Sequence, residues 1–161
     1  MSNILQVNPK NCNGCKECEI VCSSRQSDIH NPPYPRIQVI QGDSNGRFFL
    51  PTTCQHCDDP PCKAVCENSA IFRDNELNRV VVDSNKCVGC KMCVSACPFG
   101  AMGFDKTLGF AFKCDLCDGA PECVRVCKPG ALEYIDGSRL NYTRMTESAV
   151  KHYAVLRNLI S

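Results

Sequence analysis

Sixteen cysteines dominate the chemistry of this chain of 161 residues, and they fall into four groups of four. Two groups have the spacing C-x2-C-x2-C-x3-C, and the other two widen only the middle interval. The groups are Cys12, Cys15, Cys18 and Cys22; Cys54, Cys57, Cys62 and Cys66; Cys87, Cys90, Cys93 and Cys97; and Cys114, Cys117, Cys123 and Cys127. Three thiolates on one tight loop can bind three irons of a cubane, so this pattern predicts four [4Fe-4S] clusters held by cysteine alone.

The fourth cysteine of each group cannot comfortably reach the cluster that the first three bind. In the third group Pro98 follows directly, which completes the bacterial run whose last cysteine ligates the other cluster of a pair. We therefore expect Cys22, Cys66, Cys97 and Cys127 to bind clusters of other groups. The spacing alone leaves open which groups are paired.

Two other uses of cysteine fit this pattern less well. Structural zinc is satisfied by two pairs of ligands and would not need the third cysteine so close. A disulfide scaffold would need an oxidising compartment, whereas residues 1–6 lack the basic and apolar regions of a signal peptide. Because no apolar run is long enough for a bilayer, we expect a soluble cytoplasmic protein with no membrane span.

The remaining composition excludes several functions. With 18 Lys plus Arg against 17 Asp plus Glu, the net charge of +1 gives no basic field for nucleic acid. The chain has no Trp and is 7% aromatic, so metals are expected to supplement a thin apolar core. We find no phosphate-binding loop or nucleophile elbow, and therefore expect a chain that is not itself catalytic.

The elements between the cysteines are short. Each of the last three groups leads into a similar phrase, which indicates a repeated unit of cysteine loop, short helix and strand. We expect three hairpins, pairing residues 71–74 with 79–83, 102–104 with 110–112, and 36–40 with 47–50. Apolar residues at three- and four-residue intervals predict an amphipathic helix at 143–160, packed on its own domain, a partner or a second copy. Pro32, Pro33 and Pro35 indicate a rigid loop.

The order of the four groups, together with the segments Cys54-Gln55-His56-Cys57-Asp58-Asp59-Pro60-Pro61-Cys62 and Lys113-Cys114-Asp115-Leu116-Cys117, resembles a known family. This family comprises the four-cluster ferredoxin-like subunits of dimethyl sulfoxide reductase, formate dehydrogenase, hydrogenase and carbon monoxide dehydrogenase. The resemblance covers roughly residues 9–136. The short spacer 118–122 is similar to that of compact members, such as the partners of tungsten-dependent aldehyde oxidoreductases.

The resemblance implies an α+β fold of two dicluster ferredoxin-like modules with small antiparallel hairpins. The four-cluster domain would span residues 1–137, with an outer module from 1–35 and 110–137, an inner module from 50–105, and a helical tail at 138–161. It also implies four ligand sets: Cys12, Cys15 and Cys18 with Cys127; Cys114, Cys117 and Cys123 with Cys22; Cys54, Cys57 and Cys62 with Cys97; and Cys87, Cys90 and Cys93 with Cys66.

The function implied is electron transfer between a catalytic metalloenzyme subunit, of molybdenum or tungsten, hydrogenase or carbon monoxide dehydrogenase type, and a second redox partner or ferredoxin. A free polyferredoxin carrier would use the same chemistry without a permanent complex. A zinc-binding interaction protein is a third hypothesis. His56 stands between two ligands, and we expect its side chain to donate a hydrogen bond to backbone or sulfur; tuning a potential with pH is the alternative.

Overall fold

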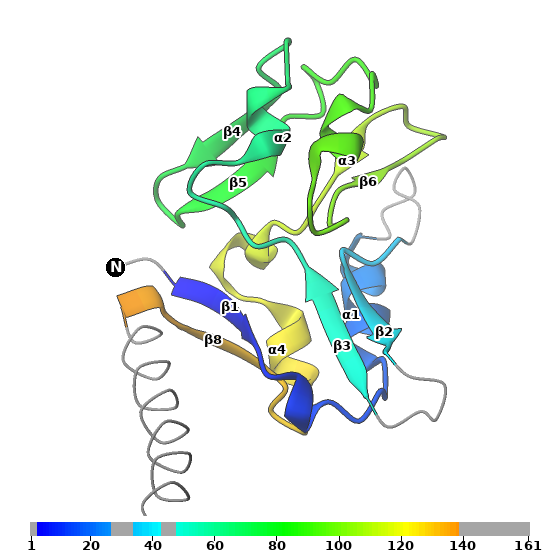
Figure 1. Cartoon of the computed structure of the whole chain (residues 1–161), viewed down its shortest axis with the longest axis vertical. Helices are drawn as coiled ribbons and strands as arrows, with labels where there is room; N and C mark the ends of the chain where they lie inside the picture. The colour runs from blue at the N-terminus through cyan, green and yellow to red at the C-terminus, as the bar shows by residue number, and fades with distance from the viewer. Residues whose placement is uncertain (1–2, 27–33, 43–47, 139–161) are drawn as a thin grey trace, which may run out of the picture.

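The computed structural model describes residues 3–26, 34–42 and 48–138, which form a small α+β fold of short elements (Figure 1). Its helices are α1 (Glu17–Gln26), α2 (Pro61–Ala64), α3 (Met92–Ala96) and α4 (Glu122–Val126). Each helix contains the third cysteine of one group, which confirms the predicted unit of loop and short helix. Two 3-10 turns, η1 (Pro9–Asn11) and η2 (Leu116–Gly119), complete the helical elements of the described residues.

All strands of the described residues pair as two-stranded antiparallel sheets. β4 (Ile71–Asp74) pairs with β5 (Arg79–Val82), and β6 (Gly103–Phe104) pairs with β7 (Ala111–Phe112). Both hairpins were predicted, although the structure shortens the second by one residue on each strand. β1 (Asn3–Val7) pairs with β8 (Leu132–Asp136), so the start of the chain meets the segment that follows the last cysteine.

The hairpin of β2 (Ile37–Gln41) and β3 (Phe49–Thr53) confirms the predicted pair and corrects its boundaries. Strands are expected at 36–40 and 47–50, whereas the structure moves the first by one residue and extends the second to Thr53. In the structure Pro51 lies inside β3, opposite Val39. A two-stranded sheet leaves one side of each strand without a partner, so a proline there can be accommodated.

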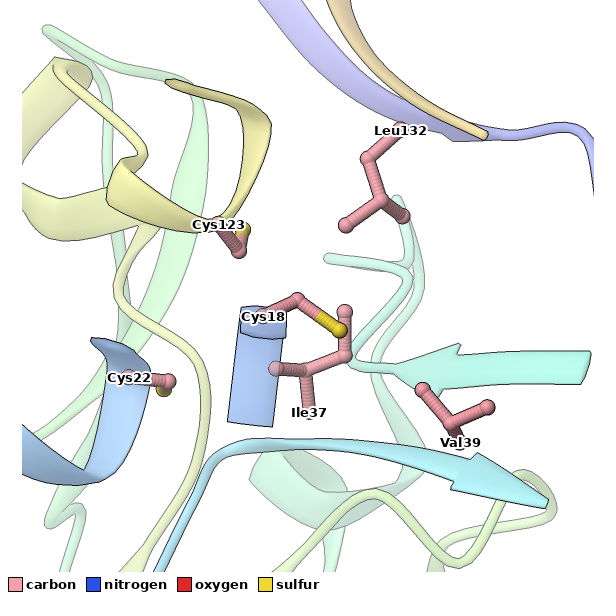
Figure 2. Packing of buried hydrophobic residues seen from close by; sticks show 6 residues of the cluster. All are labelled: Cys18, Cys22, Ile37, Val39, Cys123 and Leu132. Carbon is pink, nitrogen blue, oxygen red and sulfur yellow. The ribbon is translucent and has the colours of Figure 1, made fainter. Parts of the chain in front are cut away.

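Two separate clusters of buried side chains support these elements. Figure 2 shows the first, in which Cys18 and Cys22 from α1 and Cys123 from α4 lie around Ile37, Val39 and Leu132. The second consists of Cys62, Ile71, Val80, Cys93, Met102 and Ala111. Cysteine thus supplies three of the six buried residues of the first cluster and two of the six of the second.

Arg79 links the two halves of the fold. It belongs to β5, which lies in the upper part of Figure 1, and it contacts Asp115 and Asp118 at η2. Its guanidinium lies 2.8 Å from Asp74 in its own hairpin and 2.7 Å from Asp118, and it also donates to the backbone carbonyl of Asp115. One side chain therefore fixes the β4–β5 hairpin against the fourth cysteine loop.

Some predicted features lie outside the described residues. These are the helix at 143–160, most of the helical tail, and Pro32 and Pro33 of the proline loop. Within the part of the chain that the structure describes, no helix has the length and apolar character needed to cross a membrane.

Candidate iron-sulfur sites

The four helices place cysteines in pairs. The interval C-x3-C puts two side chains on one face of a helix, about 6 Å apart along its axis. α1 contains both Cys18 and Cys22, whereas α2, α3 and α4 carry the first of each pair and the second follows at or beyond the helix end. Each helix can therefore supply a ligand to two neighbouring sites.

Three cavities collect cysteines from different groups. Site 1 is lined by Cys12, Cys15, Cys18 and Cys127. Site 3 is lined by Cys54, Cys57, Cys62 and Cys97. Site 4 is lined by Cys87, Cys90, Cys93 and Cys66. In each, three cysteines come from one loop and the fourth comes from another group.

The remaining four cysteines form site 2, which consists of Cys114, Cys117, Cys123 and Cys22. Burial raises the pKa of Cys123, and the neighbouring sulfurs of Cys114, Cys117 and Cys22 raise it further. Cys117 in turn raises the pKa of Cys22, after the larger effect of burial. These electrostatic effects place the sulfurs of Cys114, Cys117 and Cys22 near Cys123, and the resemblance to the family implies the same set.

The sites follow one another through the fold. Cys18 of site 1 acts on the pKa of Cys123 in site 2, and Cys54 of site 3 acts on that of Cys114 in site 2. Sites 3 and 4 share α2 and α3. The order in space is therefore site 1, site 2, site 3 and site 4.

Burial holds several of the thiols in their protonated form. It raises the pKa of Cys18 and of Cys114 to about 11, and it also raises those of Cys62 and Cys93. A thiolate is the species that binds iron, so loading these sites displaces protons and exchanges them for metal.

The cysteine loops share one backbone feature. The residue before the second cysteine has a left-handed conformation in all four loops, with φ of 75° at Gly14, 47° at His56, 73° at Gly89 and 57° at Leu116. Two loops use glycine, for which this conformation has no steric penalty. The loops of sites 2 and 3 instead carry a large side chain at this position.

This turn directs backbone donors at sulfur. The N–H of His56 donates to Sγ of Cys54 at 3.3 Å, and that of Leu116 donates to Sγ of Cys114 at 3.5 Å. The N–H of Arg36 donates to Cys22 at 3.2 Å. Hydrogen bonds to the ligand sulfur stabilise the thiolate and are one of the means by which a protein sets a cluster potential.

The chemistry of the donor set fits a four-iron cluster. Sites 1, 3 and 4 each offer four thiols around a cavity, and a cubane presents one iron to each thiolate. Among the described residues, no three Cys, His, Asp or Glu side chains are placed to hold one metal ion.

The structure restricts which nitrogen of His56 can act as the predicted donor. Its Nδ1 accepts a hydrogen bond from the backbone N–H of Val80 at 3.0 Å, so only Nε2 can donate. Burial and the positive charges of Lys113 and Arg79 lower the pKa of His56 to about 3. The imidazole is therefore neutral, and its second nitrogen carries the proton.

Sequence reasoning named Lys113 in a segment that resembles the family but gave it no role. The side chain is only 4% exposed and lies in the wall of site 3. Its ammonium donates to the carbonyls of Val80 and Cys114 and lies 3.3 Å from Nδ1 of His56. A single lysine beside a cysteine is not a signal in sequence, because lysines are ordinarily exposed.

Comparison with known proteins identifies the family. Residues 46–136, more than half of the chain, match the family described as the 4Fe-4S dicluster domain. The chain belongs to this family. This confirms the prediction of an iron-sulfur electron-transfer protein and its resemblance to the iron-sulfur subunits of oxidoreductases.

Three relatives illustrate the breadth of the similarity. The polyferredoxin-like subunit of the aliphatic sulfonate oxidoreductase of Pyrococcus furiosus is 35% identical, over 82% of this chain and 77% of its own length. The B subunit of the anaerobic dimethyl sulfoxide reductase of Escherichia coli is 34% identical, over 80% of this chain and 70% of its own. The beta subunit of the NADH-dependent phenylglyoxylate dehydrogenase of Aromatoleum evansii is 34% identical over 79% of this chain.

The match to the phenylglyoxylate dehydrogenase subunit covers only 29% of that protein's length. Among solved structures, the active site complex BamBC of benzoyl coenzyme A reductase aligns with 98% of this chain and 96% of its own. Its TM-score is 0.46 and its sequence identity 22%.

Proposed function

We propose that this chain is a non-catalytic electron-transfer subunit that holds four [4Fe-4S] clusters, one in each of sites 1 to 4. The observation that carries the proposal is the crossed composition of the cavities, in which three cysteines of one loop meet the last cysteine of another group. When bound, each cluster accepts or releases one electron without a change in its ligands. The chain's residues hold the four centres in a row and exclude water from the inner ones.

The four sites divide into two modules. Sites 1 and 2 share α1 and α4, surround the first buried cluster and belong to the outer module at residues 1–35 and 110–137. Sites 3 and 4 share α2 and α3, surround the second buried cluster and belong to the inner module at residues 50–105. The pairing of β1 with β8 joins the two segments of the outer module. The contact of Arg79 with Asp118 links the inner module to the outer one, which supports a single row of four sites.

Electrons enter and leave at the two ends of the row. Cys15 in site 1 and Cys90 in site 4 are the exposed cysteines of the chain, and all others are at least partly buried. Val88 and Met92, which flank Cys90, are 67% and 56% exposed. Apolar side chains beside an exposed ligand suit a protein partner, and we assign the site 4 end to a catalytic metalloenzyme subunit of molybdenum or tungsten type.

The relatives support a catalytic partner in general, because two of them are named as a subunit and a chain of oxidoreductases. The second redox partner then meets the site 1 end. Sixteen free thiols suit the reducing environment of the cytoplasm.

A reductive titration of anaerobically purified protein tests the proposal. The chain should take up about four electrons, one for each cluster, and produce the paramagnetic signals of reduced clusters. An uptake of about two electrons would limit the chain to one dicluster module, and no uptake would contradict the proposal.

Purification of the native complex at high ionic strength separates the subunit from its alternative. A permanent subunit should remain with its catalytic partner. A free polyferredoxin carrier should be lost, because transient electron-transfer complexes bury little surface and dissociate readily.

A further inference from the structure

The surroundings of site 3 contain a buried cation that has no carboxylate partner within residues 3–26, 34–42 and 48–138. Lys113 is 4% exposed, and the ion pairs of the described residues leave it unpaired: Arg25–Asp118, Arg36–Asp115, Arg73–Asp58, Arg79–Asp74, Arg79–Asp118, Lys86–Asp83 and Arg125–Glu122. Burial of an ammonium without an anion is costly, even when its protons are hydrogen-bonded. The fold therefore places a positive charge where a negative group is needed to balance it.

The wall that contains Lys113 also contains the four cysteines of site 3. The charge of Lys113 already lowers the pKa of Cys62, although burial raises it more. A cubane with four thiolates carries about two negative charges, and one more after reduction. Site 3 thus supplies the anion that Lys113 lacks.

His56 provides a second polar group in the same wall. Since Nδ1 accepts from Val80, the ring proton lies on Nε2, and this atom is buried without a hydrogen-bond partner among the described residues. A buried donor without an acceptor is uncommon in folded proteins. The sulfides and thiolates of a cluster in site 3 are acceptors that would satisfy it.

The backbone at His56 is left-handed, with φ of 47°, as it is at Leu116 in the matching position of site 2, with φ of 57°. Glycine occupies this position in sites 1 and 4. Because Leu116 tolerates the same conformation, the case for His56 rests on its Nε2, which is unpartnered within the described residues, and not on backbone strain.

We propose that Lys113 and His56 together give the cluster of site 3 the highest reduction potential of the four, Lys113 by its charge and His56 by an N–H donated from Nε2. The inference rests on the proposed function, because it requires a cluster in site 3. Reduction adds one electron from a redox partner and breaks no bond, and the added negative charge is stabilised by the fixed ammonium and donor. The electron accordingly rests in the inner module, between its points of entry and exit.

Redox titration of the full-length chain, followed by electron paramagnetic resonance, tests the inference. In Lys113→Met, the reduction equilibrium of one cluster should move at least tenfold toward the oxidised form, which is about 59 mV for one electron. Lys113→Arg keeps the charge, so the reduction equilibrium of this cluster should stay close to that of the wild-type chain. The affected signal should be the one that is lost in Cys57→Ala, which removes a ligand of site 3.

Two further variants keep the test decisive. His56→Asn preserves an acceptor near Nδ1, tolerates the left-handed backbone and removes the Nε2 donor, so the same cluster should shift in the same direction but less. Lys91→Met is the matched control, because Lys91 is an exposed lysine in the wall of site 4, where solvent screens its charge. If Lys113→Met fails to load iron, His56→Asn decides alone.

Full iron and sulfide content, with no cluster shifting more in Lys113→Met or His56→Asn than in Lys91→Met, would overturn the inference and leave the proposed function intact. Equal shifts of all four clusters would also overturn it. Wild-type protein without iron-sulfur clusters would overturn the proposed function itself.

Discussion

Sites 3 and 4 are built from the same parts but have different surroundings. Both take ligands from α2 and α3, and both combine three cysteines of one loop with one from the other group. Site 3 has no exposed ligand and has the buried Lys113 in its wall, whereas site 4 exposes Cys90 and has the exposed Lys91. Because their ligand sets are alike, this chain distinguishes the two sites by burial and charge.

The largest expected effect follows from removal of iron from all four sites at once. Chelation under anaerobic, reducing conditions should abolish cooperative unfolding and most ordered secondary structure, because cysteine forms a large part of both buried clusters. Far-ultraviolet circular dichroism and limited proteolysis measure the change, with reductant alone as the control. An apoprotein that keeps the spectrum and transition of the loaded chain would show that the cores do not depend on metal.

Removal of single ligands should separate the two sites. Cys90→Ala removes an exposed ligand and should lower the iron content from about 16 to about 12 per chain. Cys62→Ala also opens a hole beside Ile71 and Val80 on the helix that leads to Cys66, so it should lower iron to about 8 or less. Equal iron in the two variants would contradict the difference in burial.

The loop of site 4 can be broken without a change of ligand. A Cβ at Gly89 would lie 2.6 Å from the carbonyl oxygen of Gly109, a backbone atom that cannot easily move, and φ there is +73°. Gly89→Ala should therefore lose the iron of site 4, about four per chain, and leave site 3 loaded.

Gly100→Ala is the control for this variant. Gly100 has a φ of +60°, but nothing lies within 4 Å of its Cβ position. It should cost only the left-handed strain, about 1–2 kcal/mol. If Gly89→Ala retained as much iron as Gly100→Ala, the close approach of the two loops would be unimportant.

The smallest expected effect concerns the exposed lysine of site 4. Nζ of Lys91 lies 4.5 Å from the ring centroid of Phe104. Loss of this cation–π contact in Lys91→Ala should cost about 0.5–1 kcal/mol and shift the thermal midpoint slightly, while Lys91→Arg should retain it. A loss of stability as large as that caused by Gly89→Ala would contradict the minor role expected of an exposed lysine.

Local signals made much of this fold predictable. Cysteine spacing and turn residues indicated the short helices and the hairpin of β4 and β5, because both depend on neighbouring residues. The pairing of β1 with β8 was not predicted, since it joins Asn3 to Asp136 across nearly the whole chain. The predicted end of β3 at residue 50 was wrong, because Pro51 continues the strand in a two-stranded sheet, where one side of each strand is unpaired.

The candidate sites were likewise predictable from the sequence only in part. Their cysteines could be named from spacing, and the resemblance to a family supplied their pairing. The wall of site 3 could not be predicted, because Lys113 and His56 are 57 residues apart and Val80 comes from a third segment. No periodicity or motif records that these three residues meet.

The proposed four clusters can be tested directly by the content of iron, acid-labile sulfide and zinc in anaerobically purified protein. The four sites require about 16 irons and 16 sulfides per chain, with little zinc. Stoichiometric zinc with little sulfide, in protein never exposed to air, would contradict the presence of the clusters and leave a zinc-binding interaction protein in their place.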